Sequence, residues 1–208
     1  MTPEETTSKG ERTRQAILDA AYDLFLTQGY SATSMRQVAG RSGLALGGIY
    51  NHFVSKDEIF QALVIAKHPY LQIIPLVQNV PGETVEEFVR NAARIIQKEM
   101  GSRPDFMKLM LIEIVEFSGS HFPKLFETIS PMIVPLLERF TTADSNLREL
   151  PLPLILRTFM GSIVAFYITE FLMSNPSLPA EMRNVSLEDF MNIYMHGILE
   201  HRSQKDEQ

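Results

Sequence analysis

The sequence contains no cysteine, which excludes disulfide bonds, thiolate metal sites and cysteine nucleophiles and suits a reducing compartment. It also lacks a long apolar run. The most apolar stretch, 158–169, has 12 residues, whereas a bilayer span needs about 20. We therefore interpret it as a buried helix and expect no membrane partner. The first fourteen residues are polar, without the apolar core of a signal peptide, so we expect a cytoplasmic protein.

Anionic residues are scarce in the N-terminal part, although the chain as a whole has a net charge of −6. From Lys9 to Lys56 there are six cations and three anions. The rest of the chain therefore has nine more anions than cations. A basic N-terminal segment joined to an acidic remainder allows only the N-terminal end to approach phosphate. A difference of this size can also arise by chance, so charge alone does not establish nucleic-acid binding.

Apolar residues recur with the spacing of amphipathic helices, which predicts an all-α fold of about nine helices. The first helix should end at Gly29, a short second one should run from Ser34 to Gly43, and a third should cover 44–52. A fourth should open at Lys56 and bend or end at Pro69. Capping boxes and prolines then predict five more, which begin near positions 84, 104, 123, 151 and 186.

The segment 34–52 has the geometry of a helix-turn-helix. Ala39 and Gly43 lie four residues apart, so the small residue lets two helices cross closely and the glycine takes the turn. Val38 and Ile49 would supply the apolar contacts. In such a unit the second helix presents its first residues to the major groove of DNA. Helical hairpins without DNA-binding activity are also common, so this geometry leaves both interpretations open.

This segment and its flanks resemble the N-terminal domain of the tetracycline-repressor (TetR) family over about residues 12–60. The most specific feature is Tyr50, His52 and Phe53, followed after a spacer by Lys56. The other matching positions are Arg14, Ile17, Ala20, Ala21, Leu24, Phe25, Gly29, Thr33, Ser34, Val38, Ala39, Gly43, Gly47 and Gly48. The resemblance implies a transcriptional regulator, by family default a repressor, that binds double-stranded, near-palindromic operator DNA as a homodimer.

The matched residue types suit contacts to phosphates. Tyr50 and His52 offer a hydroxyl and a ring N–H, and Lys56 opens a helix whose free N–H groups add to its charge. Thr33 and Ser34 fit the same role, although capping is their alternative role, and the nearby arginines are alternatively only solvated. We expect DNA contacts from Thr33, Ser34, Arg36, Arg41, Ala45, Leu46, Gly47, Gly48, Tyr50, Asn51, His52 and Lys56.

Two features of the third helix set it apart. Gly47 and Gly48 would each cost about 1 kcal/mol relative to alanine inside a helix. Close approach of the backbone to DNA would offset this cost, and close packing against another helix is the alternative. Ala45 and Leu46 stand where the family usually has polar or basic residues. We hypothesise that they contact thymine methyl groups, or that DNA shape contributes specificity.

The remainder of the chain resembles the family's regulatory domain only in length and helix order. Its eleven methionines suit either a plastic pocket for an apolar ligand or an ordinary core. We expect ligand contacts from Met107, Met110, His121, Arg157 and Tyr167. Glu113 and Glu116 fall opposite the face formed by Met107, Met110 and Ile114, which indicates surface or helix-pairing roles. We expect dimer contacts from Phe159, Ile163, Phe166, Glu170, Phe190, Tyr194 and Ile198.

These interpretations divide the chain into four regions: an N-terminal tail (1–9), a helix-turn-helix DNA-binding domain (10–55), a ligand-sensing and dimerisation domain (56–201) and a C-terminal tail (202–208). The unidentified effector should be a small, mostly apolar molecule that releases the operator. No catalytic, metal or cofactor motif is present, so we do not expect an enzyme. The alternative function is a helical small-molecule-binding or scaffold protein without DNA-binding activity.

Overall fold

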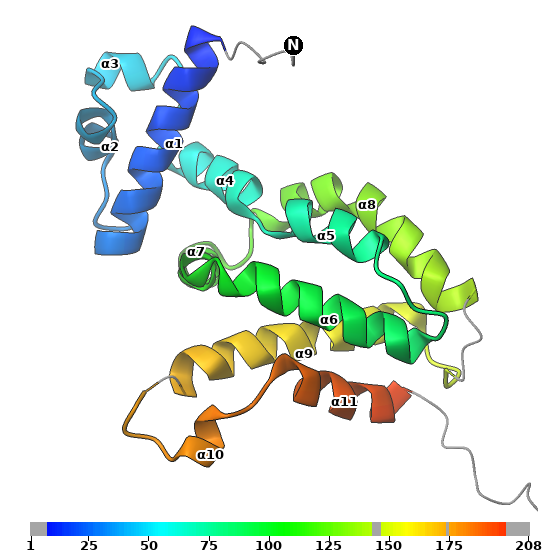
Figure 1. The fold of residues 1–208 in the computed structure, drawn as a ribbon. Coiled ribbons are helices and arrows are strands. Elements are labelled where there is room, and N and C mark those ends of the chain that lie inside the picture. The colour runs from blue at the N-terminus through cyan, green and yellow to red at the C-terminus, as the bar shows by residue number, and fades with distance from the viewer. Residues whose placement is uncertain (1–7, 143–146, 174, 199–208) are drawn as a thin grey trace, which may run out of the picture. The chain divides into compact units, whose positions relative to one another are not determined.

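The computed structural model describes residues 8–142, 147–173 and 175–198, which form eleven helical segments and no strand (Figure 1). The all-α prediction is confirmed. Two helices were not predicted. The fourth helix ends at Lys67, before Pro69, as expected, but the chain resumes as a helix at Tyr70 because proline is tolerated at a helix start. The other unpredicted helix is a four-residue turn, Ala180–Arg183.

The chain divides into two compact units, and neither begins at the expected boundary between 55 and 56. Unit 1 comprises Met1–His68 and Pro104–Ile129, and unit 2 comprises Pro69–Arg103 and Ser130–Gln208. Unit 1 contains α1 (Lys9–Gln28), α2 (Met35–Arg41), α3 (Leu46–Ile49), α4 (Lys56–Lys67), α7 (Pro104–Phe117) and the first part of α8 (Phe122–Thr142). Unit 2 contains the rest of α8 together with α5 (Tyr70–Gln78), α6 (Val85–Gly101), α9 (Leu152–Met173), α10 (Ala180–Arg183) and α11 (Leu187–Ile198).

An aromatic cluster explains why α4 and α7 belong to unit 1. Phe60 of α4 stacks on Phe117 of α7, with ring centroids 4.6 Å apart. Tyr30 packs edge-on against both rings, and Phe25 of α1 lies 5.6 Å from Phe60. Each such aromatic pair adds about 0.5–1.5 kcal/mol beyond the area it buries. The core of the helix-turn-helix therefore continues through α4 into α7.

The buried face of α7 differs from the expected one. Phe106, Leu109 and Glu113 point into unit 1, whereas Ile114 is 59% exposed. The charged Glu113 is buried because it bonds His121, the residue before α8. Its predicted role in helix pairing agrees with this contact, but the methionine-lined face that sequence spacing selected is not the buried one.

His68 lies at the C-terminal end of α4. Its ring packs edge-on against Phe106, with centroids 4.9 Å apart. Burial lowers the pKa of His68 to about 4, because removal from water penalises the charged imidazolium. The residue is therefore a neutral part of the unit 1 core at ordinary pH.

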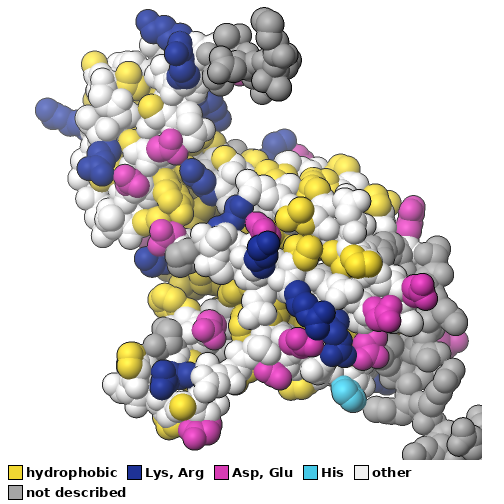
Figure 2. All heavy atoms as spheres, viewed as in Figure 1, with side chains coloured by type: hydrophobic (Ala, Val, Ile, Leu, Met, Phe, Trp, Pro, Cys, Tyr) yellow, Lys and Arg dark blue, Asp and Glu magenta, His cyan; other side chains and the backbone are white. Residues whose placement is uncertain are grey.

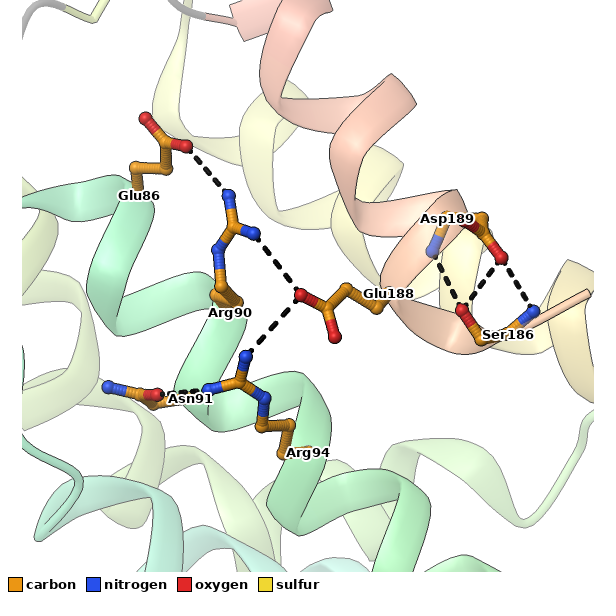
Figure 3. A network of polar contacts seen from close by, with 7 residues as sticks. All are labelled: Glu86, Arg90, Asn91, Arg94, Ser186, Glu188 and Asp189. Atoms are coloured by element: carbon orange, nitrogen blue, oxygen red, sulfur yellow. Dashed lines mark hydrogen bonds and ion pairs between the residues drawn. The ribbon is translucent and has the colours of Figure 1, made fainter.

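In unit 2, α11 packs against α6 and α9. Figure 3 shows the polar contacts that hold its first turn: Arg90 of α6 bridges Glu86 and Glu188, at 2.8 and 3.1 Å, and Arg94 reaches Glu188 at 3.4 Å. Ser186 and Asp189 cap the same turn, as predicted. These ion pairs are partly exposed, so they orient α11 more than they stabilise it.

The residues predicted to contact a second chain are mostly engaged inside unit 2. Ile163, Phe166, Tyr194 and Ile198 are buried, and the Tyr194 hydroxyl donates to the Ile155 carbonyl at 2.9 Å. Phe159 and Phe190 are half-buried in the same α9–α11 packing, and only Glu170 is exposed. Most of these residues join α9 to α11 within one chain, and their contacts with a second chain remain predictions.

The opposite face of α9 is apolar and exposed. It carries Leu154, Val164, Phe171 and Leu172, each between 42% and 58% exposed. Of the described helices, α9 alone is long and apolar enough to cross a membrane, and little of it is buried. The sequence predicts a buried helix over 158–169. Only one side of α9 is buried as predicted, and the other side leaves an apolar surface exposed to solvent.

Candidate DNA interface

The turn between α2 and α3 has the geometry that the sequence predicts. Gly43 adopts a φ of 74°, a left-handed conformation that disfavours residues with a Cβ. The Leu44 N–H donates back to the Ala39 carbonyl at 2.9 Å, which closes the turn. Val38 and Ile49 are fully buried. The helix pair is therefore a rigid helix-turn-helix.

The outer surface of α3 and the following turn consists of the predicted contact residues. Leu46 is 41% and Tyr50 50% exposed, and Ala45, Gly47 and Asn51 are exposed beside them. Lysine and arginine side chains surround the N-terminal helices in Figure 2. Val54, 77% exposed in the loop after α3, adds an apolar group that sequence reasoning missed because it lies in the spacer of the matched motif and belongs to no helix.

Neither glycine of α3 is required by packing within the chain. A Cβ at Gly47 would meet no heavy atom within 4 Å, and one at Gly48 would meet only Leu44 Cβ at an ordinary 3.9 Å. Neither residue has a positive φ. The alternative explanation, close packing against another helix, therefore does not apply within the described residues. Packing among the described residues therefore does not explain the choice of glycine at either position.

Lys56 points inward. Its Nζ donates to the carbonyls of Tyr30 and Thr33, at 2.7 and 2.6 Å, and lies 4.0 Å from the centroid of the Tyr30 ring. Burial lowers the pKa of Lys56 from its ordinary value, and the nearby Glu116 opposes that shift. The ammonium thus ties the start of α4 to the loop before α2, and its expected contact with a phosphate is not the contact seen here.

Thr33 and Ser34 are also engaged within the chain. Thr33 is buried, and its hydroxyl donates to the Gly29 carbonyl at 2.8 Å. Ser34 forms the predicted capping box with Gln37. The capping alternative therefore accounts for both hydroxyls, and their phosphate contacts remain predictions without geometric support.

The two arginines of α2 differ in their surroundings. Arg41 forms an exposed ion pair with Asp23 at 3.2 Å, whereas Arg36 is exposed and has no ion pair among the described residues. Arg36 is therefore the better candidate for a phosphate or base contact. A surface pair such as Arg41–Asp23 is weak, so Arg41 can exchange partners at little cost.

Arg14 supports the turn that carries Tyr50 and His52. Its guanidinium lies 4.1 Å from the centroid of the Phe53 ring and donates to the His52 carbonyl at 3.4 Å. The half-buried His52 is thereby held close to α1. Arg14 was among the matched positions, but sequence reasoning gave it no role because its partners lie 38 and 39 residues away.

The predicted ligand residues fall in both units and do not form one site within either. In unit 1, Met107 and Met110 are half-buried, and His121 is bonded to Glu113 and Asp57. In unit 2, Arg157 is exposed, and the Tyr167 hydroxyl donates to the Ile96 carbonyl at 3.4 Å. Burial raises the pKa of Tyr167 well above its ordinary value.

The helix-turn-helix segment matches a known family. The sequence model described as "Bacterial regulatory proteins, tetR family" matches residues 17–63, which span α1 to α4. Residues 17–63 therefore form a TetR-family helix-turn-helix segment.

Bacterial transcriptional regulators are similar to the chain over the same segment. It is 39% identical over 66 residues to the HTH-type transcriptional regulator SrpR of Pseudomonas putida, which is 31% of each chain. It is 41% identical over 59 residues to the regulator AcrR of Shigella flexneri, covering 28% of this chain and 27% of AcrR. The aligned part is thus about a third of each relative's length, and the similarity is that of the N-terminal domain.

Solved structures extend the likeness to nearly the whole fold. SmeT, the repressor of the Stenotrophomonas maltophilia multidrug efflux pump SmeDEF, has a TM-score of 0.66 at 21% identity, with 94% of each chain covered. Salmonella enterica GusR has a TM-score of 0.67 at 17% identity, with 92% of this chain and 98% of GusR covered. At these identities the likeness shows a shared fold and nothing about ligands.

Proposed function

We propose that this chain is a ligand-responsive transcriptional repressor that binds a near-palindromic operator through α2, α3 and the turn after α3. The observation that carries the proposal is the pair Gly47 and Gly48, which the packing of the chain does not require. A DNA backbone or base edge close to α3 gives them a reason. The similar regulators SrpR and AcrR and the repressor SmeT support this function.

The geometry refines which residues contact DNA. We propose that Arg36, Tyr50, Asn51 and His52 hold phosphates or polar base edges, because each has an exposed or half-exposed polar group. Gly47 and Gly48 admit the close approach, and Arg41 joins if its pair with Asp23 exchanges. Lys56 acts as an internal tie, since its ammonium is already bonded to two carbonyls.

The apolar start of α3 is proposed to read thymine methyl groups. Ala45 and Leu46 are exposed and offer no hydrogen-bond donor from their side chains. Replacing the thymines of a bound operator by uracil removes only the methyl groups. Unchanged affinity for the uracil operator would refute this part of the proposal.

A second copy of the chain is the proposed cover for the exposed face of α9. Leu154, Val164, Phe171 and Leu172 form an apolar stripe along one side of that helix. Two-fold pairing of α9 and α11 with their symmetry mates would bury the stripe and place two copies of α3 about one DNA turn, ~34 Å, or a multiple apart. An effector that prefers a different spacing would then release the operator.

The effector is proposed to be a small, mostly apolar molecule bound in unit 2. Two tyrosine hydroxyls lie among apolar side chains there: Tyr70 donates to Met160 Sδ at 3.7 Å and Tyr167 to the Ile96 carbonyl. Such a combination, an apolar lining with a few polar groups, is typical of small-molecule sites.

Retention on genomic DNA fragments as salt is varied tests the whole proposal. Several phosphate contacts predict that affinity falls steeply between 50 and 200 mM salt, by about a thousandfold or more for six or more contacts. Selection of bound fragments then yields the operator, whose half-site spacing tests the dimer. Absent or salt-independent binding would favour the scaffold function instead.

A further inference from the structure

A buried histidine joins three helices of unit 1 at the corner between α7 and α8. His121 is almost fully buried, as is Glu113 of α7. The backbone N–H of His121 donates to Glu113 Oε1 at 2.9 Å, and the ring atom Nδ1 of His121 lies 2.8 Å from Glu113 Oε2. On the other side of the ring, Nε2 lies 3.3 Å from Oδ1 of Asp57, in the first turn of α4. Two carboxylates from different helices thus hold the ring.

The chain turns sharply to place this histidine. Ser118 and Gly119 both have positive φ, 53° and 77°, and a serine in this region costs of order 1 kcal/mol. The turn brings His121 back over Glu113 and beside the stacked rings of Phe60 and Phe117, whose centroids lie 5.7 and 4.6 Å from that of the imidazole. The contacts of His121 offset the cost of the turn.

The hydrogen-bond geometry depends on the charge of the imidazole. An ionised Glu113 only accepts hydrogen bonds, so Nδ1 must carry a proton. A neutral ring then has a bare Nε2 that faces the Asp57 carboxylate without a proton to share. Only the imidazolium donates to both carboxylates.

The other charged groups of the surrounding elements are engaged elsewhere. The ammonium of Lys56 on α4 is bonded to loop carbonyls, Glu116 of α7 accepts from Ser31 at 2.9 Å, and Lys124 of α8 pairs with Glu127. On α4, Glu58 accepts from the Val54 N–H. Asp57 and Glu113 are therefore the two carboxyl groups that contact His121.

We propose that His121 is a positioning residue that ties the first turn of α4 to the α7–α8 corner through Asp57. The proposal rests on the proposed function, since the object that it positions is the DNA-binding helix pair. The same turn of α4 carries Lys56, which holds the loop before α2. Loss of the Asp57 contact therefore removes a support of the turn that holds this loop, and DNA affinity falls.

The experiment uses the full chain with three variants. His121→Asn keeps a donor near the Nδ1 position for Glu113 but removes the contact with Asp57. Asp57→Asn changes an exposed side chain and leaves the core intact. Asp105→Asn is the matched control, because this α7 carboxylate pairs only with Lys108 among the described residues.

A double-mutant cycle on urea unfolding measures the tie directly. We expect Asp57 and His121 to be coupled by roughly threefold to tenfold in the unfolding constant, because the histidine is buried while Asp57 is exposed. Absence of coupling would overturn the bridge, whether or not the protein binds DNA.

Operator affinity tests the positioning role. We expect His121→Asn and Asp57→Asn each to lose roughly threefold to tenfold in affinity, and the double variant to lose no more than either one alone, while Asp105→Asn follows the wild type. Because no DNA contact is removed, the slope of affinity against salt should not change. Wild-type affinity in both His121→Asn and Asp57→Asn would overturn the positioning role. Failure of the wild type to bind any DNA would overturn the proposed function, and the unfolding cycle would still decide the bridge.

Discussion

Replacing Gly47 with alanine should raise the free energy of unfolding and lower the affinity for DNA. The new methyl group would meet no atom of the chain within 4 Å, and the backbone has no positive φ there. Alanine is favoured over glycine in a helix by roughly 0.5–1 kcal/mol. Because α3 is only four residues long, we expect the lower end of this range, about 0.5 kcal/mol more free energy of unfolding.

The effect on DNA should have the opposite sign. If the α3 backbone lies against a sugar, phosphate or base, a methyl group at Gly47 forces the two surfaces apart. Loss of even one charge-assisted contact costs about 1.5–3 kcal/mol, so affinity should drop by at least tenfold, since 1.4 kcal/mol corresponds to a factor of ten.

Two measurements on the same preparation decide the outcome: urea unfolding, and fluorescence anisotropy with a labelled operator at fixed salt. Gly101→Ala is the matched control, because Gly101 also lies in a helix, is exposed and has no neighbour within 4 Å. It should stabilise the chain without changing affinity. Undiminished operator affinity in Gly47→Ala would refute the close approach and with it the main support for the DNA interface.

Four further predictions follow from single contacts. Lys56→Met should lower the free energy of unfolding by about 1–3 kcal/mol, since two carbonyls lose their donor, and leave the salt dependence of DNA binding unchanged. Arg36→Ala should reduce the magnitude of that salt slope by about 1. Val164→Glu should raise the dimer dissociation constant roughly a hundredfold or more in sedimentation experiments, because a charge would be buried unpaired, whereas Gln97→Glu on α6 should not. Burial lowers the pKa of His68 to about 4, so the unfolded chain binds more protons than the folded chain between pH 6.5 and 4. The free energy of unfolding should therefore fall by at most about 3 kcal/mol as the pH is lowered through that window. In His68→Gln, urea unfolding should lack this part of the loss.

Local signals in the sequence predicted local structure correctly. The cap at Ser34, the turn at Gly43 and the helix end before Pro69 each depend on one residue and its immediate neighbours. The family motif likewise lies within one short segment. Such features are set by backbone conformation and by hydrogen bonds over three or four residues, so the sequence alone contains the necessary information.

Orientation toward distant partners could not be predicted in the same way. Lys56 was expected to face DNA, but the carbonyls that bind it come from residues 26 and 23 positions earlier. Both sides of α9 are apolar. The side with Ile163 and Phe166 packs on α11 and the side with Val164 is exposed, but the spacing of apolar residues does not distinguish the two. In each case a tertiary contact chose between two orientations that the local pattern allowed equally.

The first turn of α4 gathers three of these distant contacts. Ser55 caps the helix, with its hydroxyl accepting from the Glu58 N–H. Lys56 holds the loop before α2, and Asp57 reaches His121 at the α7–α8 corner. Consecutive residues thus face the DNA-binding helices on one side and α7 on the other. A shift of α7 or α8 by a fraction of an ångström would change the Asp57 contact first, because it is the longest of these contacts, at 3.3 Å, and half-exposed. A movement of α7 or α8 would therefore change DNA affinity through the Asp57 contact, while the hydrogen bonds of Lys56 keep the loop before α2 attached to α4.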